Sequence, residues 1–567
     1  MEETLHWLDY AVVFGYLAVS LGFGCALSRQ TNRDEFLTAG RSMGRITVGL
    51  SVMATLFSAN SFVMYPSTAY ASSLRIFMAV VAFWAMGPLV AWVFIPVYSK
   101  LNCVTAYEYL EKRFHVSVRC LASALFIILR VAWMAAATFA ASVAISGISG
   151  VNQYVITVGL GAVAVAYTML GGLRAVMWTD VLQFFVFVGT IVFAAALLIA
   201  QADGGASQIV NTYFEGRENL LFDFSLDPTF RFGTIAILIG SFLEALSAFG
   251  ADQVAVQRYL AAKDTRTSQT GFLISLLGLL VVIPGLLMIG MGLFSYFKHH
   301  PEALTPVILV KLEESGDEKT AAIRNRFEEA WKRQSARQPS ASGSATLATW
   351  IESHYRKNPT ELHADIVELG LNDNALPQFV RLKFPPGVVG LLVAALMAAT
   401  MSSIDSGIHS ITTALVVDFR DRLCPTLRPV TEAGEMLFAR LLVVAIGVLA
   451  ITLACFVGEL GDVFAVAKKT VGAFAAPLLA VFILGLFVRR ATSAGVFMGT
   501  WIGAAFTLWV MLRFEDWFSM WFFPIGFFSS LGLSLLLSLL PYPGKRPSTE
   551  SVLTFWTVVH SDANNPD

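Results

Sequence analysis

Long apolar stretches alternate with short polar connections along almost the whole chain. A helix needs roughly 20 apolar residues to cross a bilayer, and about thirteen stretches are long enough to do so. They cover residues 8–27, 45–71, 76–98, 118–148, 152–170, 174–200, 233–259, 269–297, 386–416, 435–457, 461–488, 493–512 and 517–541. The pattern predicts an all-α polytopic membrane protein with about thirteen transmembrane helices.

One polar segment, residues 299–385, interrupts this pattern. Its centre, KLEESGDEKTAAIRNRFEEAWKRQSARQPSASGS, mixes both signs of charge at helical spacing and then becomes rich in serine and glycine. This composition is typical of a solvated helical cap followed by a flexible link. A docking surface for another protein is the alternative, but nothing else in the sequence indicates an obligatory protein partner.

The polar connections alternate in charge, which predicts the orientation of the chain. Short loops rich in Lys and Arg stay on the cytoplasmic side of a membrane. The basic connections are residues 28–45, 109–119, 257–266, 420–428, 488–490 and 544–546, and the acidic or neutral ones are 1–9, 457–462 and 514–519. We therefore expect the N-terminus and the insertion outside and the C-terminus in the cytoplasm, in the plasma membrane or, in a bacterium, the inner membrane.

The composition excludes several classes of protein. Charged residues make up 14% of the chain, whereas soluble proteins carry about 25%. The net charge of -1 argues against a nucleic-acid partner, since such domains carry a basic excess. The five cysteines are scattered, without the spacing of a disulfide framework or a zinc site. We also find no nucleophile or metal-ligand set of the kind that a membrane enzyme requires.

The stretch MAATMSSIDSG, residues 397–407, places polar side chains in the middle of an apolar span. Each such position costs about 2.5 to 3.5 kcal/mol and is functional by default. Ala399, Ser402, Ser403 and Ser406 stand at i, i+3, i+4 and i+7, so they share one helix face. Several oxygens with little net charge suit a small hard cation. Serines that allow close helix packing and bond to their own helix are the alternative.

Two other spans carry weak helix formers at mid-depth. In the second span these are residues 58–61, with Pro66 beyond, and in the seventh they are residues 247–250. A helix that unwinds inside a protein exposes backbone carbonyls, which can complete the coordination of a cation. The two spans lie five apart, which suits an inverted repeat of five plus five helices with the site at the broken midpoints.

Four long motifs stand in order along the chain: TAYEYLEKRF (105–114), AYTMLGGLRAVMWTDVLQ (166–183), DQVAVQRYLAAK (252–263) and GLLVAALMAATMSSIDSGIHS (390–410). Together they resemble the sodium:solute symporter family, which includes sodium-coupled sugar, proline, sialate, monocarboxylate, iodide and vitamin carriers. The resemblance covers roughly residues 1–300 and 375–541. It implies a leucine-transporter-like 5+5 inverted repeat with an extra N-terminal helix.

The resemblance also implies how the chain divides. We expect an extra N-terminal transmembrane helix, a first five-helix repeat, a second repeat interrupted by the extracellular insertion, two C-terminal transmembrane helices and a cytoplasmic tail. The corresponding ranges are residues 1–28, 44–200, 233–488 interrupted by 299–385, 491–541 and 542–567.

The family's sodium site maps onto five residues of this sequence. The resemblance implies that the first broken helix supplies the carbonyls of Ala54 and Phe57. The polar helix would supply the carbonyl of Ala399 and the hydroxyls of Ser402 and Ser403.

Three further polar residues bear on the number of ions. Asp180, in WTDVLQ, matches an acidic residue near that site, where its charge would attract a cation in a low dielectric. Some relatives hold a second sodium with the next hydroxyls along. Here Ser406 is kept, but Asp405 replaces a serine, so Asp405 could bind the second ion or pair with an arginine.

Candidate solute contacts lie around the two breaks. Asn60, Ser61, Ser247 and Phe249 are expected to line a cavity because breaks border it. Ser61 and Ala248 stand where the sugar carriers have glutamine and tyrosine, which argues against a sugar.

A second comparison with the family points to an anion. The run Phe-Gly-Ala-Asp-Gln at 249–253 resembles the Tyr-Gly-x-Asn-Gln run of the monocarboxylate, iodide and vitamin carriers. Arg130 could hold a carboxylate by a bidentate bond, and Glu244, one turn before the second break, is a further candidate solute contact. The alternative is that Glu244 is the structural partner of Arg130.

These observations predict a sodium-coupled secondary active symporter that imports a small solute by alternating access, such as a small organic anion of the monocarboxylate type. Sodium is the expected coupling ion, and the lipid bilayer and the solute are the other expected partners. Proton coupling, or a sugar or amino acid as the solute, are alternatives within the same fold. A transporter-like solute sensor is a further alternative, although the polar segment after residue 540 is too short for an output domain of the usual kind.

Overall fold

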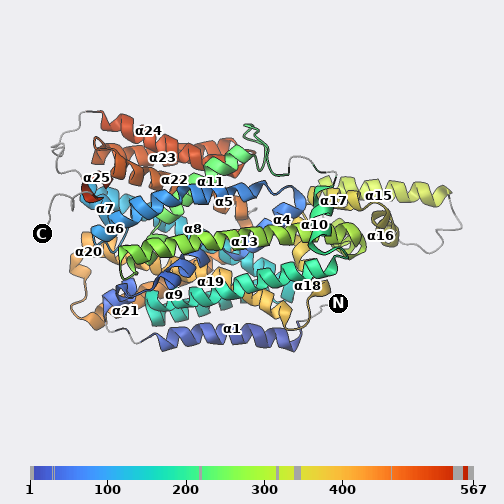
Figure 1. Cartoon of the computed structure of the whole chain (residues 1–567), viewed down its shortest axis with the longest axis horizontal. Coiled ribbons are helices and arrows are strands. Elements are labelled where there is room, and N and C mark those ends of the chain that lie inside the picture. The colour runs from blue at the N-terminus through green and yellow to red at the C-terminus, as the bar shows by residue number, and fades with distance from the viewer. Residues whose placement is uncertain are drawn as a thin grey trace.

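The computed structural model describes residues 5–28, 30, 32–215, 217, 220–314, 318–337, 347–460, 463–540 and 553–559. Within these residues all regular elements are helical, and a single backbone bridge joins Met43 and Ala262. The long helices run side by side along the long axis of the molecule (Figure 1). The N-terminus lies at the same end as the insertion, and the C-terminus lies at the opposite end (Figure 1).

Ten helical segments of the described chain are long and apolar enough to cross a membrane. One of them, residues 75–100, contains α5 and α6 joined through a π-helical turn at Val90–Phe94. The helices are α1 (Trp7–Ala26), α5 (Met78–Leu89) with α6 (Ile95–Lys100), α8 (Val116–Ser149), α9 (Gln153–Gln201), α13 (Thr265–His299), α19 (Val388–Ala414), α21 (Glu432–Phe456), α22 (Val463–Phe487), α23 (Ser493–Arg513) and α24 (Phe522–Ser538).

Two further spans are broken helices, as predicted. Helices α3 (Arg45–Ala54) and α4 (Ala59–Ala71) meet at an angle of 64°, and α11 (Thr234–Gly250) and α12 (Gln253–Leu260) meet at 46°. Each pair stands where the first helix of a predicted five-helix repeat is expected. They raise the number of spans to twelve.

The exact position of each break differs from the prediction by a few residues. The first break covers residues 55–58 and the second 251–252, whereas the sequence predicted 58–61 and 247–250. In both broken spans a polar residue at the break caps the second half-helix: Ser58 caps α4 and Asp252 caps α12. Ser58 precedes α4 and its N–H donates to Ser61 Oγ (3.4 Å), and the Asp252 carboxylate accepts from the Val254 N–H (2.8 Å) at the start of α12.

Helix α9 is a hairpin of two spans. Gly172 has φ 52° and ψ −155°, a conformation outside the helical region that glycine tolerates best. Gln183 Nε2 lies 3.4 Å from the Tyr167 hydroxyl, although 16 residues of straight helix would separate them by about 24 Å. The chain therefore folds back at Gly172, and counting the two legs separately confirms the predicted thirteen spans.

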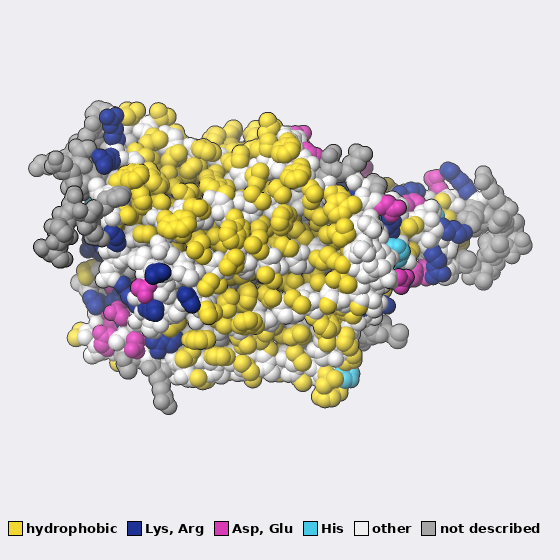
Figure 2. Space-filling view, viewed as in Figure 1, with side chains coloured by type: hydrophobic (Ala, Val, Ile, Leu, Met, Phe, Trp, Pro, Cys, Tyr) yellow, Lys and Arg dark blue, Asp and Glu magenta, His cyan; other side chains and the backbone are white. Residues whose placement is uncertain are grey.

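A broad apolar belt surrounds the bundle. Figure 2 shows hydrophobic side chains over the middle of the molecule, while the charged side chains gather near its two ends. Large apolar side chains such as Phe14 (65% exposed), Trp92 (56%) and Trp509 (57%) point outward from different helices. This surface suits a multi-pass membrane protein, because lipid rather than water would contact it.

The insertion forms a helical lobe at one end of the bundle (Figure 1). Ser67 near the end of α4 donates to Asp373 and accepts from Asn372 Nδ2 (2.5 Å), which fastens the lobe to the broken helix. The His363 ring packs edge-on against Tyr70 and Phe294. The predicted helical cap is present, but most of the predicted Ser/Gly-rich link, residues 338–346, lies outside the described residues. The lobe helices are α14 (Thr305–Glu314), α15 (Glu318–Arg337), α16 (Leu347–Lys357), α17 (Pro359–Glu368) and α18 (Ala375–Lys383).

Short helices complete the described chain. They lie in the connections between spans at the two ends of the bundle, except for α25, which follows the last span. They are α2 (Arg33–Thr38), α7 (Tyr107–Arg113), α10 (Gly205–Phe214), α20 (Asp421–Leu423) and α25 (Phe555–Val559).

Candidate functional site

The polar face of α19 lies against the break between α3 and α4. Ser402 Oγ is 3.0 Å from the carbonyl oxygen of Ala54, the last residue of α3, and 3.0 Å from the carbonyl oxygen of Ala399. Ser403 Oγ donates to the same Ala399 carbonyl (3.3 Å). The structure thus brings Ala54, Ala399, Ser402 and Ser403 together, although the sequence separates α3 from α19 by more than 300 residues.

A small cavity of about 10 Å³ lies at this junction, close to what one water-sized particle needs. Ala54, Phe57, Ala399, Ser402 and Gln183 line it together with the apolar residues Met53, Phe184, Phe187 and Val282. Ser403 does not line the cavity, and its hydroxyl is held by the Ala399 carbonyl. Neutral hydroxyl and carbonyl oxygens are the donors that a hard cation prefers, so the residues present fit sodium.

Asp180 is wholly buried on the second leg of α9, but it does not line this cavity. Its Oδ2 accepts from Arg258 Nη2 (2.9 Å) and from Ser51 Oγ (2.5 Å). The carboxylate therefore neutralises a buried arginine.

Arg258 is a functional candidate that our sequence reasoning missed. We counted it among the basic residues of the loop 257–266, yet its side chain is completely buried in α12. It donates to Asp180 and Ser51, to the Val254 carbonyl and to Ser406 Oγ. Its position inside the predicted span 233–259 was the available signal, because an ionisable residue within a span is functional by default.

Asp405 and Ser406 join the same buried network from α19. Tyr167 donates its hydroxyl to Asp405 Oδ2 (2.5 Å), and Ser406 Oγ donates to Asp405 Oδ1 (3.0 Å). Because Ser406 also accepts from Arg258, one hydroxyl links the arginine to Asp405. The second sodium that we predicted at Ser406 and Asp405 stays a prediction.

A larger cavity of about 160 Å³ adjoins the small one. All the solute contacts that the sequence predicted line it: Asn60, Ser61, Arg130, Glu244, Ser247 and Phe249. Phe57 lines both cavities. The aromatic side chains of Tyr65, Phe83 and Trp133 add to a mostly apolar wall, which is typical of a small-molecule site with a few polar groups.

Arg130 is already paired within this cavity. Its Nε and Nη2 both donate to Asp252 Oδ2, at 2.9 and 2.5 Å. The hypothesis that Glu244 is the structural partner of Arg130 is therefore wrong, because that partner is Asp252 at the break of the seventh span. Asp252 opens the motif at 252–263, but the motif alone does not indicate that this carboxylate lines the cavity.

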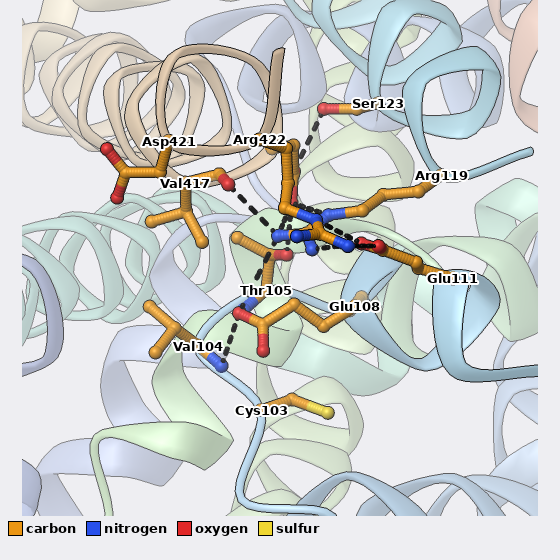
Figure 3. A network of polar contacts seen from close by, with 12 residues as sticks. Cys103, Val104, Thr105, Glu108, Glu111, Arg119, Ser123, Val417, Asp421 and Arg422 are labelled. Atoms are coloured by element: carbon orange, nitrogen blue, oxygen red, sulfur yellow. Dashed lines mark hydrogen bonds and ion pairs between the residues drawn. The ribbon is translucent and has the colours of Figure 1, made fainter. Parts of the chain in front are cut away.

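A second ionic network (Figure 3) lies around α7 and α20, at the end of the bundle opposite the insertion (Figure 1). Arg119 at the start of α8 donates to Asp418 (2.7 Å) and to Glu111 on α7 (2.6 Å). Thr105 and Ser123 also donate to Asp418. Arg422 and Arg119 hold the pKa of Glu111 below its ordinary value, although partial burial opposes this shift. The network ties α7 and α8 to residues 415–423, which continue α19 as a π-helical turn and then form α20.

Comparison with known proteins agrees with this geometry. A model of the sodium:solute symporter family matches residues 36–312 and 352–503, and the gap between the two matches falls inside the insertion. The sodium/sialic acid symporter SiaT of Proteus mirabilis is 28% identical over 506 residues, which cover 87% of this chain and 87% of that protein. Human sodium-coupled monocarboxylate transporter 1 is 28% identical over 510 residues, 88% of this chain and 73% of that protein.

A solved structure shows the same fold. A Na+-coupled sialic acid symporter in a substrate-bound, outward-open state superimposes with a TM-score of 0.76 and 24% identity, over 95% of this chain and 99% of that one. The leucine-transporter-like fold predicted from the sequence is therefore confirmed. Since the family model matches well over half of the residues, the chain belongs to the sodium:solute symporter family, with sodium as its coupling ion.

Proposed function

We propose that this protein imports a small solute with sodium by alternating access. Sodium binds between the carbonyls of Ala54 and Phe57 and the polar face of α19 at Ala399, Ser402 and Ser403. The solute occupies the adjoining cavity. The observation that carries the proposal is that Phe57, at the break between α3 and α4, lines both cavities, so the two ligands would share one wall.

Sodium would couple to the solute through this break. An ion between α3 and α19 would be coordinated by the two oxygens that now share a hydrogen bond, the Ser402 hydroxyl and the Ala54 carbonyl. This coordination would fix the α3–α4 break in one conformation. That conformation shapes the wall of the solute cavity through Phe57. The membrane potential would supply about 2.3 kcal/mol per charge for each 100 mV.

We propose a small organic anion, such as a monocarboxylate, as the solute. Two things support it: Arg130 faces the cavity, and the relatives of this chain include a sialic acid symporter and a monocarboxylate transporter by name. A carboxylate would bind Arg130 beside Asp252 or in its place, because Asp252 already accepts two of the guanidinium hydrogen bonds.

We also propose the orientation that the loop charges predict. The N-terminus and the insertion would lie outside the cell and the C-terminus in the cytoplasm, in the plasma membrane or a bacterial inner membrane. The placement of the N-terminus with the insertion, opposite the C-terminus (Figure 1), supports this topology.

The experiment combines a screen with an uptake assay. Purified protein is heated with sugars, amino acids, carboxylates and inorganic anions, each in sodium chloride and in choline chloride, to find solutes that raise the unfolding temperature only with sodium. Proteoliposomes then take up the best solute under a sodium gradient. Equal accumulation in choline would overturn sodium coupling, and accumulation driven by a pH gradient alone would indicate proton coupling.

A further inference from the structure

A short segment after the last span, residues 553–559 with the helix α25 (Phe555–Val559), lies against the end of the bundle opposite the insertion (Figure 1). We call it the docked segment. Thr554 and Val558 are 0% and 5% exposed, whereas Trp556 is 52% exposed. Because positions i and i+4 share one helix face, the segment packs on the protein with one defined side.

Two hydrogen bonds fasten the docked segment through its backbone. Lys100 Nζ, at the end of α6, donates to the carbonyl oxygen of Val559 (2.9 Å). The hydroxyl of Tyr109 on α7 donates to the carbonyl oxygen of Leu553 (3.2 Å). The two ends of the segment are therefore held by two different elements of the bundle.

Aromatic side chains connect the same segment to α22. The ring of Phe555 lies 6.2 Å from the ring of Phe487, the last residue of α22. Phe482, five residues earlier on α22, is wholly buried and stacks on the ring of Tyr109, with 6.4 Å between the ring centroids. The hydroxyl that binds the docked segment thus belongs to a ring packed on α22. The segment bridges α6, α7 and α22.

These three elements continue into helices that line the solute cavity. Helix α5, which leads into α6, contributes Ala79 and Phe83 to its wall. Helix α8, which follows α7, contributes Arg130, and α22 contributes Val471 and Ala475. A cavity opens toward one side only when the helices around it separate there. A segment bonded across all three opposes that separation.

We infer that the docked segment is a clamp that must detach from α6, α7 and α22 before the solute cavity opens toward the C-terminal end of the bundle. The occupancy of this docking surface would then set the rate of transport. Two hydrogen bonds and one short helix are weak enough to release within a transport cycle. The inference rests on the proposed function, because opening toward this end is one half of alternating access.

A cysteine in the cavity wall measures this opening before any solute is known. Ala248 lines the solute cavity and is half-buried, so Ala248→Cys is made in the full chain after its five native cysteines are replaced by alanine. A charged, membrane-impermeant thiol reagent is added to membrane vesicles on the side of the C-terminus. A chain that ends at residue 552 should be labelled about fivefold faster, because the two hydrogen bonds no longer oppose opening. A chain that ends at residue 559 is the matched control.

A covalent link tests whether the segment has to detach. Phe555→p-benzoylphenylalanine places a photoreactive ring against α22, and irradiation joins the two. Labelling of Ala248→Cys should then fall about fivefold relative to the unirradiated protein. The same amino acid at Trp556, on the exposed face, is the control and should leave labelling unchanged. Full labelling of the protein linked through position 555 would overturn the clamp.

Sodium separates this inference from the proposed function. In the full chain, labelling should differ between sodium chloride and choline chloride, because the ion would fix the α3–α4 break. If labelling responds to sodium but not to loss or linking of the docked segment, only the clamp is wrong. If it responds to the segment but not to sodium, the clamp stands and the proposed sodium coupling is wrong.

A second variant covers the case in which the shortened chain does not fold. Val558→Asp puts a charge at a position that is 5% exposed, which should detach the segment from the complete protein. Loss of the photochemical link from position 555 verifies the detachment. Labelling should again rise about fivefold, and an unchanged rate in the detached protein would contradict the inference.

Discussion

Ser402 on α19 lies 3.0 Å from the carbonyl oxygen of Ala54 at the last turn of α3. This contact joins the polar helix to the half-helix whose carbonyls are released by the break at residues 55–58. The Ser402 hydroxyl lies within reach of two carbonyl oxygens. One small cation could replace these hydrogen bonds, because the hydroxyl and both carbonyl oxygens could then coordinate it.

Removing the neighbouring hydroxyl should weaken sodium binding. Ser403→Ala is expected to raise the half-saturating sodium concentration about tenfold, because the proposed site needs the Ser403 hydroxyl to turn from the Ala399 carbonyl toward the ion. Equilibrium binding of radiolabelled sodium to purified protein measures this. Thr412→Val on the same helix is the control, since the Thr412 hydroxyl bonds to the Ile408 carbonyl of its own helix. Unchanged affinity in Ser403→Ala would mean that the site is misplaced.

Breaking the pair between Arg130 and Asp252 should destabilise the protein. Arg130→Met leaves the Asp252 carboxylate, which is 3% exposed, without its guanidinium, at a cost of about 3 to 5 kcal/mol. The double variant Arg130→Met with Asp252→Asn should recover much of this loss, because no buried charge remains. Thermal unfolding in detergent compares the wild-type protein, the single variants Arg130→Met and Asp252→Asn, and the double variant. If the double variant is as unstable as the sum of the two single ones, the two residues are not coupled.

The hairpin in α9 should depend on Gly172. Its φ of 52° is strained for any other residue, and an added Cβ would lie 2.7 Å from the Phe36 ring. Gly172→Ala should therefore lower stability by about 2 kcal/mol or more, and with it the yield of folded protein. Gly159→Ala is the matched control on the same helix, because its Cβ would meet no atom within 4 Å. Size-exclusion chromatography of both variants measures the folded fraction, and equal yields would contradict the prediction.

The attachment of the insertion should weaken in acid through His363. Burial, with the nearby Arg217 charge, lowers the pKa of His363 from 6.5 to about 4. Because the folded protein holds the neutral ring, its contribution is complete above pH 6.5 and is lost as the pH falls toward 4. The shift corresponds to about 3 kcal/mol.

A variant without a titrating ring isolates this effect. His363→Phe keeps an aromatic ring against Tyr70 and Phe294, and its unfolding temperature should fall less than that of the wild-type protein between pH 7 and pH 4. The difference between the two proteins, followed by intrinsic tryptophan fluorescence, is the quantity of interest. A difference that does not change with pH would contradict the buried neutral state.

Much of the architecture could be predicted from the sequence. Apolar length predicted the thirteen spans, and the paired weak helix formers near Ser58 and Ser247 predicted both broken helices to within a few residues. The face that carries Ser402 and Ser403 was also predicted, because helical spacing alone places those hydroxyls together. These features depend on local sequence, where hydrophobic period, helix propensity and turn chemistry act over one or two helical turns.

Partnerships between distant segments were decided only by the tertiary structure. Arg258 was assigned to a loop but is buried against Asp180, Arg130 pairs with Asp252 and not with Glu244, and Gln183 was not noticed beside the cavity. A buried charge or amide takes whichever partner packing brings within about 3 Å. The sequence thus determines which helices form and which polar groups they carry, while the packing of α9, α12 and α19 against the break decides which of those groups meet, since no local pattern encodes that distance.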